Sequence, residues 1–155
     1  MKLSLQYIAG LLDGEGYFGI MKLKNKACTL GYYYCPVIKI ALRSRDSKVL
    51  DILHKQYGGW IDKERKHPNG QSPSRCWVFK YKKHLSEILK ELYPHLFIKK
   101  KQARILMDFI EAGAVKTRNQ DKMNKERIAL DSKREILYKK ILTLNHRGVL
   151  PAETE

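Results

Sequence analysis

Apolar and polar residues alternate in some segments of this chain and recur at helical spacing in others. Alternation predicts strands at 17–26, 32–43, 60–66 and 76–81. Helical spacing predicts helices at about 5–12, 47–57, 85–92 and 103–110, and over a long basic segment at 123–144. The first seven elements follow the order αββαββα, which predicts an α+β fold with one curved antiparallel sheet and helices packed on one of its faces.

The predicted strand at 32–43 has one clearly apolar face. Ile38, Ile40 and Leu42 fall on the same side, because successive residues of a strand point to opposite faces. Lys39 and Arg43 fall on the other side, together with Tyr33, Cys35, Val37 and Ala41. We therefore expect the Ile/Leu side to meet the core and the other face of the sheet to be rich in Lys, Arg and Tyr.

The first strand does not divide so simply. Apolar residues occur at both parities there, so Lys22 and Lys24 reach the basic face only if the strand contains a bulge. We include both in the predicted basic face. Its side chains are Lys22, Lys24, Tyr33, Lys39, Arg43, Lys63, Arg65 and Lys80.

Charge turns this pattern into a hypothesis about the partner. The 155 residues carry 31 Lys and Arg against 16 Asp and Glu, for a net charge of +15 and a pI near 9.8. Such a field favours nucleic acid, and an exposed antiparallel sheet can enter the major groove of double-stranded DNA. A protein that binds anionic lipid is the alternative from charge alone. No apolar run of about 20 residues and no signal peptide are present, so no membrane partner is expected.

The cysteines add little chemistry. Cys28, Cys35 and Cys76 are odd in number and contain no C-x-x-C pair, so neither a disulfide framework nor a zinc site is indicated. This usage favours an intracellular, reduced setting, with the compartment left open between an organelle and a prokaryotic cytoplasm.

Two acidic residues close the first predicted helix. Ser4 is a suitable N-cap, and Gly14 and Gly16 are expected to end the helix. Asp13 and Glu15 then lie at the negative end of the helix dipole, where carboxylates are disfavoured. A divalent cation held by carboxylate and backbone oxygens would compensate, whereas the alternative leaves both acids in solvent.

The stretch Ile8-Ala9-Gly10-Leu11-Leu12-Asp13-Gly14-Glu15-Gly16 resembles the motif of the LAGLIDADG homing endonucleases. The motif occurs once, which in that family implies a homodimer. The resemblance implies that Glu15 binds metal with the Gly14 carbonyl and that Asp13 is structural. The implied dimer interface is made by Ile8, Ala9, Gly10, Leu12 and Asp13.

The resemblance extends to Gln102-Ala103. The segment 96–103 is similar to the lysine-rich start of a late helix in the family, which implies that Lys99 is the active-site lysine. The family also has a polar residue, usually Gln, that orients the attacking water near the end of the second strand. Here that region contains Arg43 and Ser44, and we expect Ser44 to take the role.

Together these observations predict a homodimeric, site-specific double-strand DNA endonuclease that cuts a long pseudo-palindromic site in intron homing. The resemblance implies Mg²⁺ as cofactor, with Mn²⁺ as another option and Ca²⁺ as a substitute that does not support cleavage. The alternative is an intron RNA-binding maturase or a non-catalytic DNA-binding protein on the same scaffold. Residues 1–147 are expected to form one domain, and 148–155 a C-terminal tail.

Overall fold

A computed structural model describes residues 2–26, 31–65, 72–80, 82–113 and 120–146. Its sheet has the strand order β1-β2-β4-β3, and every neighbouring pair is antiparallel. The predicted α+β class is confirmed. The elements in chain order are α1 (Leu5–Glu15), β1 (Gly16–Lys24), β2 (Tyr32–Arg43), the 3-10 turn η1 (Ser44–Asp46), α2 (Lys48–Tyr57), β3 (Trp60–Ile61), β4 (Ser74–Phe79), α3 (Lys82–Leu92), the 3-10 turn η2 (Tyr93–His95), α4 (Lys100–Glu111) and α5 (Gln120–Asn145).

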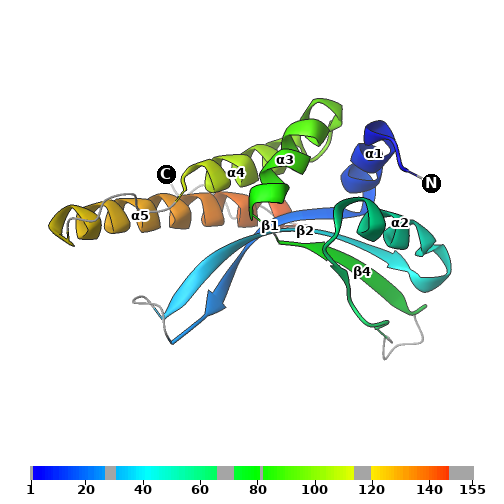
Figure 1. Ribbon diagram of the computed structural model, residues 1–155, viewed down its shortest axis with the longest axis horizontal. Coiled ribbons are helices and arrows are strands. Elements are labelled where there is room, and N and C mark those ends of the chain that lie inside the picture. The colour runs from blue at the N-terminus through cyan, green and yellow to red at the C-terminus, as the bar shows by residue number, and fades with distance from the viewer. Residues whose placement is uncertain (1, 27–30, 66–71, 81, 114–119, 147–155) are drawn as a thin grey trace.

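All the helices lie on one side of the sheet. Figure 1 shows α1, α3, α4 and α5 above the strands and α2 above β4, while the ends of the sheet bend down and away from them. We call the covered side the helix face and the other side the outer face. None of the described helices covers the outer face (Figure 1), which is the side predicted to meet DNA.

The core forms between the helix face and the helices. Alternate residues of the strands supply its floor, and the helices supply its cover, as the apolar periodicity predicts. The largest side chains that are fully buried are Phe18, Ile20, Ile38, Ile40 and Phe79 from the strands and Ile8, Leu12, Leu50, Leu53, Leu85, Leu89 and Phe109 from the helices.

Element boundaries follow the predictions with three main differences. The strand predicted at 76–81 is Ser74–Phe79. The strand predicted at 60–66 is only Trp60–Ile61, followed by an isolated bridge between Arg65 and Ser74. The pairing shifts by one residue between Ile61↔Trp77 and that bridge, so a bulge interrupts the strand. The helix α1 continues through Gly14 to Glu15, where a stop at Gly14 was also expected.

The predicted outward position of Lys22 and Lys24 is wrong. β1 pairs with β2 in one continuous register from Gly16↔Ile40 to Lys24↔Tyr32, and no residue is left over for a bulge. Both lysines therefore share the helix face with Phe18. The bulge described above follows β3 and does not affect the side-chain directions of β1.

Lys22 has a structural partner on that face. Its Nζ donates to Glu135 of α5 at 3.1 Å and lies 4.1 Å from the centre of the Tyr32 ring. The Tyr34 hydroxyl also donates to Glu135. This hydrogen bond and that of Lys22 lower the pKa of Glu135. Glu135 thus joins α5 to the hairpin formed by β1 and β2.

We expect Glu135→Ala to reduce the free energy of unfolding by about 1 to 2 kcal/mol, because two donors lose their acceptor. Urea denaturation measures this, and the same substitution at the exposed Glu126 of α5 should change stability by no more than about 0.5 kcal/mol.

Since the pKa of Glu135 is lowered on folding, the stabilisation that Glu135 contributes is fully present above its unfolded pKa. It is lost as pH falls through the lower folded value, so the difference between wild type and variant should shrink in acid. Equal stabilities at neutral pH would contradict this role of Glu135.

Candidate functional site

The C-terminal end of α1 meets the start of β1 without an intervening loop. Ser4 caps the helix, its Oγ accepting from the backbone N–H of Tyr7 at 3.2 Å. The helix ends at Gly16, where a Cβ atom would lie only 2.5 Å from the carbonyl oxygen of Leu12. A residue other than glycine at this position would push strand and helix apart. Gly16 therefore sets where Glu15 stands relative to the sheet.

Asp13 connects this end of α1 to the segment that precedes α4. Its Oδ2 accepts from the backbone N–H of Phe97 at 2.8 Å, and its Oδ1 accepts from that of Lys99 at 2.9 Å. Asp13 is buried, so the two N–H groups replace water as its partners. The carboxylate also lies at the positive N-terminal end of α4, which offsets its unfavourable place at the end of α1.

Lys99 lies over the carbonyl groups that end α1. Its Nζ donates to the carbonyl oxygens of Leu12 at 3.0 Å, Gly14 at 3.3 Å and Gly16 at 2.6 Å. The carbonyls of Leu12 and Gly14 carry the negative end of the helix dipole, which the ammonium group neutralises. The carbonyls of Gly14 and Gly16 flank Glu15, so the positive charge lies immediately beside that residue.

Glu15 itself is exposed. Its carboxylate and the Gly14 carbonyl are oxygen donors of the kind that Mg²⁺ and Ca²⁺ prefer. In the described part of the chain, no cluster of three or more His, Cys, Asp or Glu could hold a metal ion. One chain thus fits a divalent cation only with few protein ligands, which suits Mg²⁺ that keeps water or phosphate in most positions.

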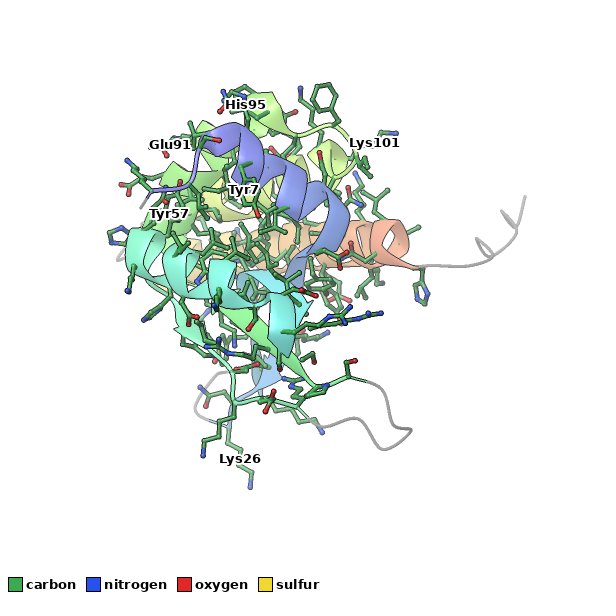
Figure 2. The ribbon with its side chains drawn as sticks, turned by 90° about the vertical axis from the view of Figure 1, so that its right-hand side faces the viewer. Tyr7, Lys26, Tyr57, Glu91, His95 and Lys101 are labelled. Carbon is green, nitrogen blue, oxygen red and sulfur yellow. The ribbon has the colours of Figure 1, made fainter. Side chains whose placement is uncertain are left out.

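The side of α1 that faces away from the core is open. Figure 2 looks onto this side of the molecule, with Tyr7 labelled on α1. Tyr7 is 52% exposed, and a Cβ atom built at Gly10 or Gly14 would meet nothing within 4 Å. The helix therefore presents two glycines four residues apart, on one face, with empty space in front of them.

The residues expected at the dimer interface need correction. Ile8, Ala9, Leu12 and Asp13 are buried within the chain's own core, so their side chains are not free to meet a second chain. Of the five expected residues, Gly10 alone lies on the exposed side.

Ser44 also differs from its predicted role. Its Oγ is buried and has no hydrogen-bond partner among the described residues. Ser44 follows the last residue of β2 and lies four residues beyond Ile40, which pairs with Gly16, so it is roughly 13 Å from the end of α1. A buried hydroxyl at that distance is not placed to orient water beside Glu15.

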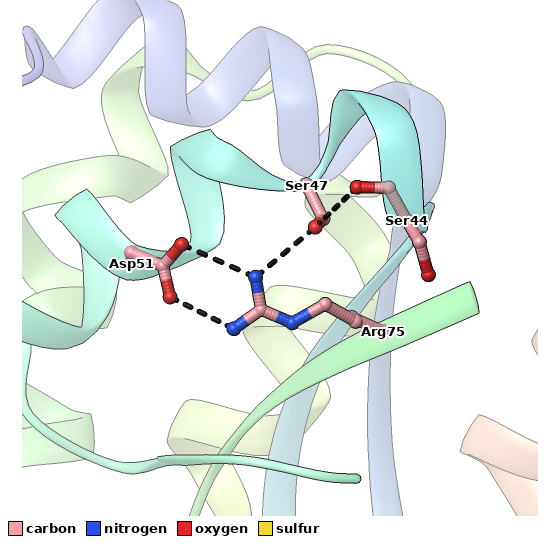
Figure 3. A network of polar contacts seen from close by, with 4 residues as sticks. All are labelled: Ser44, Ser47, Asp51 and Arg75. Carbon is pink, nitrogen blue, oxygen red and sulfur yellow. Dashed lines mark hydrogen bonds and ion pairs between the residues drawn. The ribbon is translucent and has the colours of Figure 1, made fainter. Parts of the chain in front are cut away.

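The polar residues around Ser44 form a hydrogen-bond network that joins secondary-structure elements (Figure 3). The Arg75 guanidinium binds both carboxylate oxygens of Asp51, at 2.9 and 3.2 Å, and donates to Ser47 Oγ at 3.2 Å. The Ser47 hydroxyl donates in turn to the carbonyl oxygen of Ser44 at 2.8 Å. The hydrogen bond from Arg75 lowers the pKa of Asp51. This network holds the start of α2 against β4.

Lys39 is nearer to the motif than sequence reasoning indicated. It pairs across the hairpin with Tyr17, two residues after Glu15, and both side chains belong to the outer face. Its Nζ lies 5.8 Å from the centre of the Tyr17 ring. Strand parity had assigned Lys39 to the DNA-binding face, but only the register shows that it lies beside the motif.

Of the remaining predicted basic residues, Arg43, Arg65 and Lys80 lie on the outer face toward β3. Lys80 Nζ lies 4.8 Å from the centre of the Trp60 ring, and Trp60 Nε1 donates to Asp62. Arg65 pairs with Asp62 at 3.0 Å. The residues Tyr33, Arg43, Lys63 and Arg65 are exposed. The outer face thus combines basic and aromatic side chains, as expected.

The sequence matches one family model. The model, described as LAGLIDADG endonuclease, covers residues 8–112, which is more than half of the chain. This chain therefore belongs to the LAGLIDADG endonuclease family, and its class of activity is that of a DNA endonuclease. Among curated proteins, none matches this sequence.

Solved structures of homing endonucleases share the fold. I-CvuI, in complex with DNA, is 17% identical with a TM-score of 0.73, over 95% of this chain and 85% of that one. The archaeal intron-encoded I-Vdi141I, complexed with DNA, is 18% identical with a TM-score of 0.71, over 94% and 86%. I-TnaI is 22% identical with a TM-score of 0.61, over 93% and 97%. At these identities the likeness concerns the fold.

Within the described residues, no helix combines the length and the apolar character that crossing a bilayer requires.

We expect Asp13→Asn to lower the free energy of unfolding by about 1 to 3 kcal/mol, because the amide NH₂ group would face a backbone N–H and leave it unpaired. Chemical denaturation monitored by fluorescence measures this. Glu15→Gln is the matched control, since Glu15 is exposed and should change stability by about 0.5 kcal/mol at most. If both substitutions had equal effects, Asp13 would not join α1 to α4 as described.

Proposed function

We propose that this protein is a homodimeric, site-specific DNA endonuclease that uses divalent cations to hydrolyse one phosphodiester bond in each strand. The observation that carries the proposal is the exposed Glu15 carboxylate between two carbonyls that bind Lys99 Nζ. An acid and a cation thus stand together at the edge of a basic, uncovered sheet face.

Glu15 would hold the metal, with the Gly14 carbonyl as a second oxygen donor. When bound, a divalent cation supplies a Lewis acid for the phosphate and lowers the pKa of bound water. Few protein ligands per chain leave room for phosphate oxygens and water, as Mg²⁺ requires.

Lys99 would stabilise negative charge on the phosphate. Its ammonium group is already oriented by three carbonyls, so little reorganisation is needed when the charge develops. Asp13 acts through Lys99, since its hydrogen bond to the Lys99 N–H holds the backbone from which that side chain extends. Lys39, across from Tyr17, adds a second positive charge on the outer face near the motif.

The open side of α1 supports the proposed dimer. Gly10 and Gly14 would let a second α1 approach closely, because no side chain separates the two backbones. Phe97 is 86% exposed and Ile98 is 74% exposed, in the segment that Asp13 ties to α1. Such large apolar side chains are costly in solvent, and a second copy would cover them. Two Glu15 carboxylates would then meet near the twofold axis.

The outer face would bind the DNA. Lys39, Arg43, Lys63, Arg65 and Lys80 remain as candidates for phosphate and base contacts, together with Tyr33, whereas Lys22 and Lys24 do not. Twisted antiparallel strands fit the major groove and present alternate side chains to base edges. Two such sheets related by a dyad would read a pseudo-palindromic site.

We expect Glu15→Gln to lower the rate of cleavage on the order of 1,000-fold, because metal binding loses its charged ligand. Binding to the same DNA should change by no more than about threefold, since phosphate contacts dominate affinity. Gel assays of cleavage with Mg²⁺, after selection of a site from a randomised DNA library, measure the first quantity. Fluorescence anisotropy measures the second.

Glu126→Gln is the matched control for Glu15→Gln, since it removes an equal charge from an exposed position of α5. It should cut at the wild-type rate. Normal cutting by Glu15→Gln would refute the assignment of Glu15. Tight DNA binding by the wild type with no cleavage in Mg²⁺ or Mn²⁺ would instead favour a non-catalytic binding protein.

We expect Gly10→Leu to raise the dissociation constant of the dimer at least about tenfold, because the added side chain fills the space that a second helix needs. The stability of one chain should not fall, since a Cβ atom at Gly10 meets nothing within 4 Å. Analytical ultracentrifugation over a range of concentrations measures the equilibrium. Ser132→Leu, at an exposed position of α5, should leave it unchanged. A wild-type protein that sediments as a monomer throughout would contradict the dimer.

A further inference from the structure

The outer face of the sheet has two arms of different chemistry. Beyond Gly19 and Val37, the arm made by β1 and β2 presents Met21 opposite Cys35 and Leu23 opposite Tyr33. None of these four described residues is charged. The other arm carries Arg43, Arg65 and Lys80 on the same face.

The outer face of the arm made by β1 and β2 lacks charge at these four positions because of the strand register. Lys22 and Lys24 alternate with Met21 and Leu23, and the continuous pairing turns both lysines to the helix face. There Lys22 binds Glu135. The segment is basic as a sequence, but the side that would meet DNA is apolar. Met21 and Leu23 are half-buried, and Tyr33 is 43% exposed, so all three remain accessible to a ligand.

In the major groove, an apolar side chain finds one matching group. The C5-methyl of thymine is the apolar feature of the base edges there, whereas the other features are hydrogen-bond donors and acceptors. A lysine or glutamine at position 21 or 23 would instead favour guanine or adenine. We propose that Met21 and Leu23 make this arm select thymine in the outer part of each half-site. The inference rests on the proposed binding of DNA by the outer face.

The register also sets where these thymines should lie. Met21 and Leu23 are five and seven residues beyond Gly16, so they stand roughly 16 and 23 Å along β1 from the end of α1. At about 3.4 Å per base step, they would meet bases roughly five to seven steps from the cut. Lys39 lies closer to the motif, opposite Tyr17. The arm that carries Arg43, Arg65 and Lys80 extends from the motif in the other direction.

The test removes the methyl group from the DNA. A high-affinity site is first selected by binding from a randomised duplex library, and each thymine is then replaced singly by deoxyuridine. We expect about fourfold weaker binding at one or two outer positions of each half-site, which is the effect of losing one buried carbon. Replacement at central positions should have less effect.

Protein variants assign the effect to one residue. In Leu23→Ser, the preference for thymine over deoxyuridine at the matching position should fall to about onefold, because a hydroxyl gains nothing from a methyl group. Lys24→Ser is the matched control: the position is adjacent, but the side chain belongs to the helix face. It should retain the wild-type preference.

Two results would overturn the inference. One is a selected site without thymine at the outer positions. The other is equal binding of thymine and deoxyuridine at every outer position by the wild type. Both results differ from those that would contradict the proposed function. The proposed function fails if the protein binds DNA and selects thymine but does not cut, or if it binds no DNA.

Discussion

The buried carboxylate of Asp13 is the interaction on which the site depends. It binds the backbone of Phe97 and Lys99, two residues that are more than 80 positions away in the sequence. Through these hydrogen bonds, the end of one helix and the start of another become one unit. Lys99 can then reach the carbonyls around Glu15, and the apolar side chains of the joining segment are held beside α1. The proposed catalytic geometry and the proposed surface for a second chain therefore depend on the same hydrogen bonds.

Much of the fold follows from local patterns. The bounds of β2 are as predicted, because Ile38, Ile40 and Leu42 recur at every second position and alternate with Lys39 and Arg43 toward its end. The helix α2 ends as expected at Gly58 and Gly59, both of which have a positive φ of 80° that favours glycine. Where the residues of one element contain both the apolar periodicity and the residue that ends it, the sequence alone predicts the bounds of that element.

The site was predictable only in part. The resemblance to the family indicated Glu15 and Lys99, but no sequence pattern reveals that Lys99 contacts the carbonyls of Leu12, Gly14 and Gly16, more than 80 positions away in the chain. Charge misled the assignment of Lys22: apolar residues occur at both parities of the first strand, and only its continuous pairing with β2 places Lys22 on the helix face. The burial of Ser44 depends on how α2 and β4 pack, and that packing involves Arg75 from a distant strand. Each error concerns contacts between elements.

The unbroken pairing of β1 with β2 has a consequence for how this protein could change its target. Because side chains alternate strictly, inserting or deleting one residue within β1 would exchange the two sides of the arm. The lysines would lose Glu135, and Met21 would enter the space beneath α5. Viable descendants with altered target preference should therefore differ by replacements at odd-numbered positions of this strand, while its length stays constant.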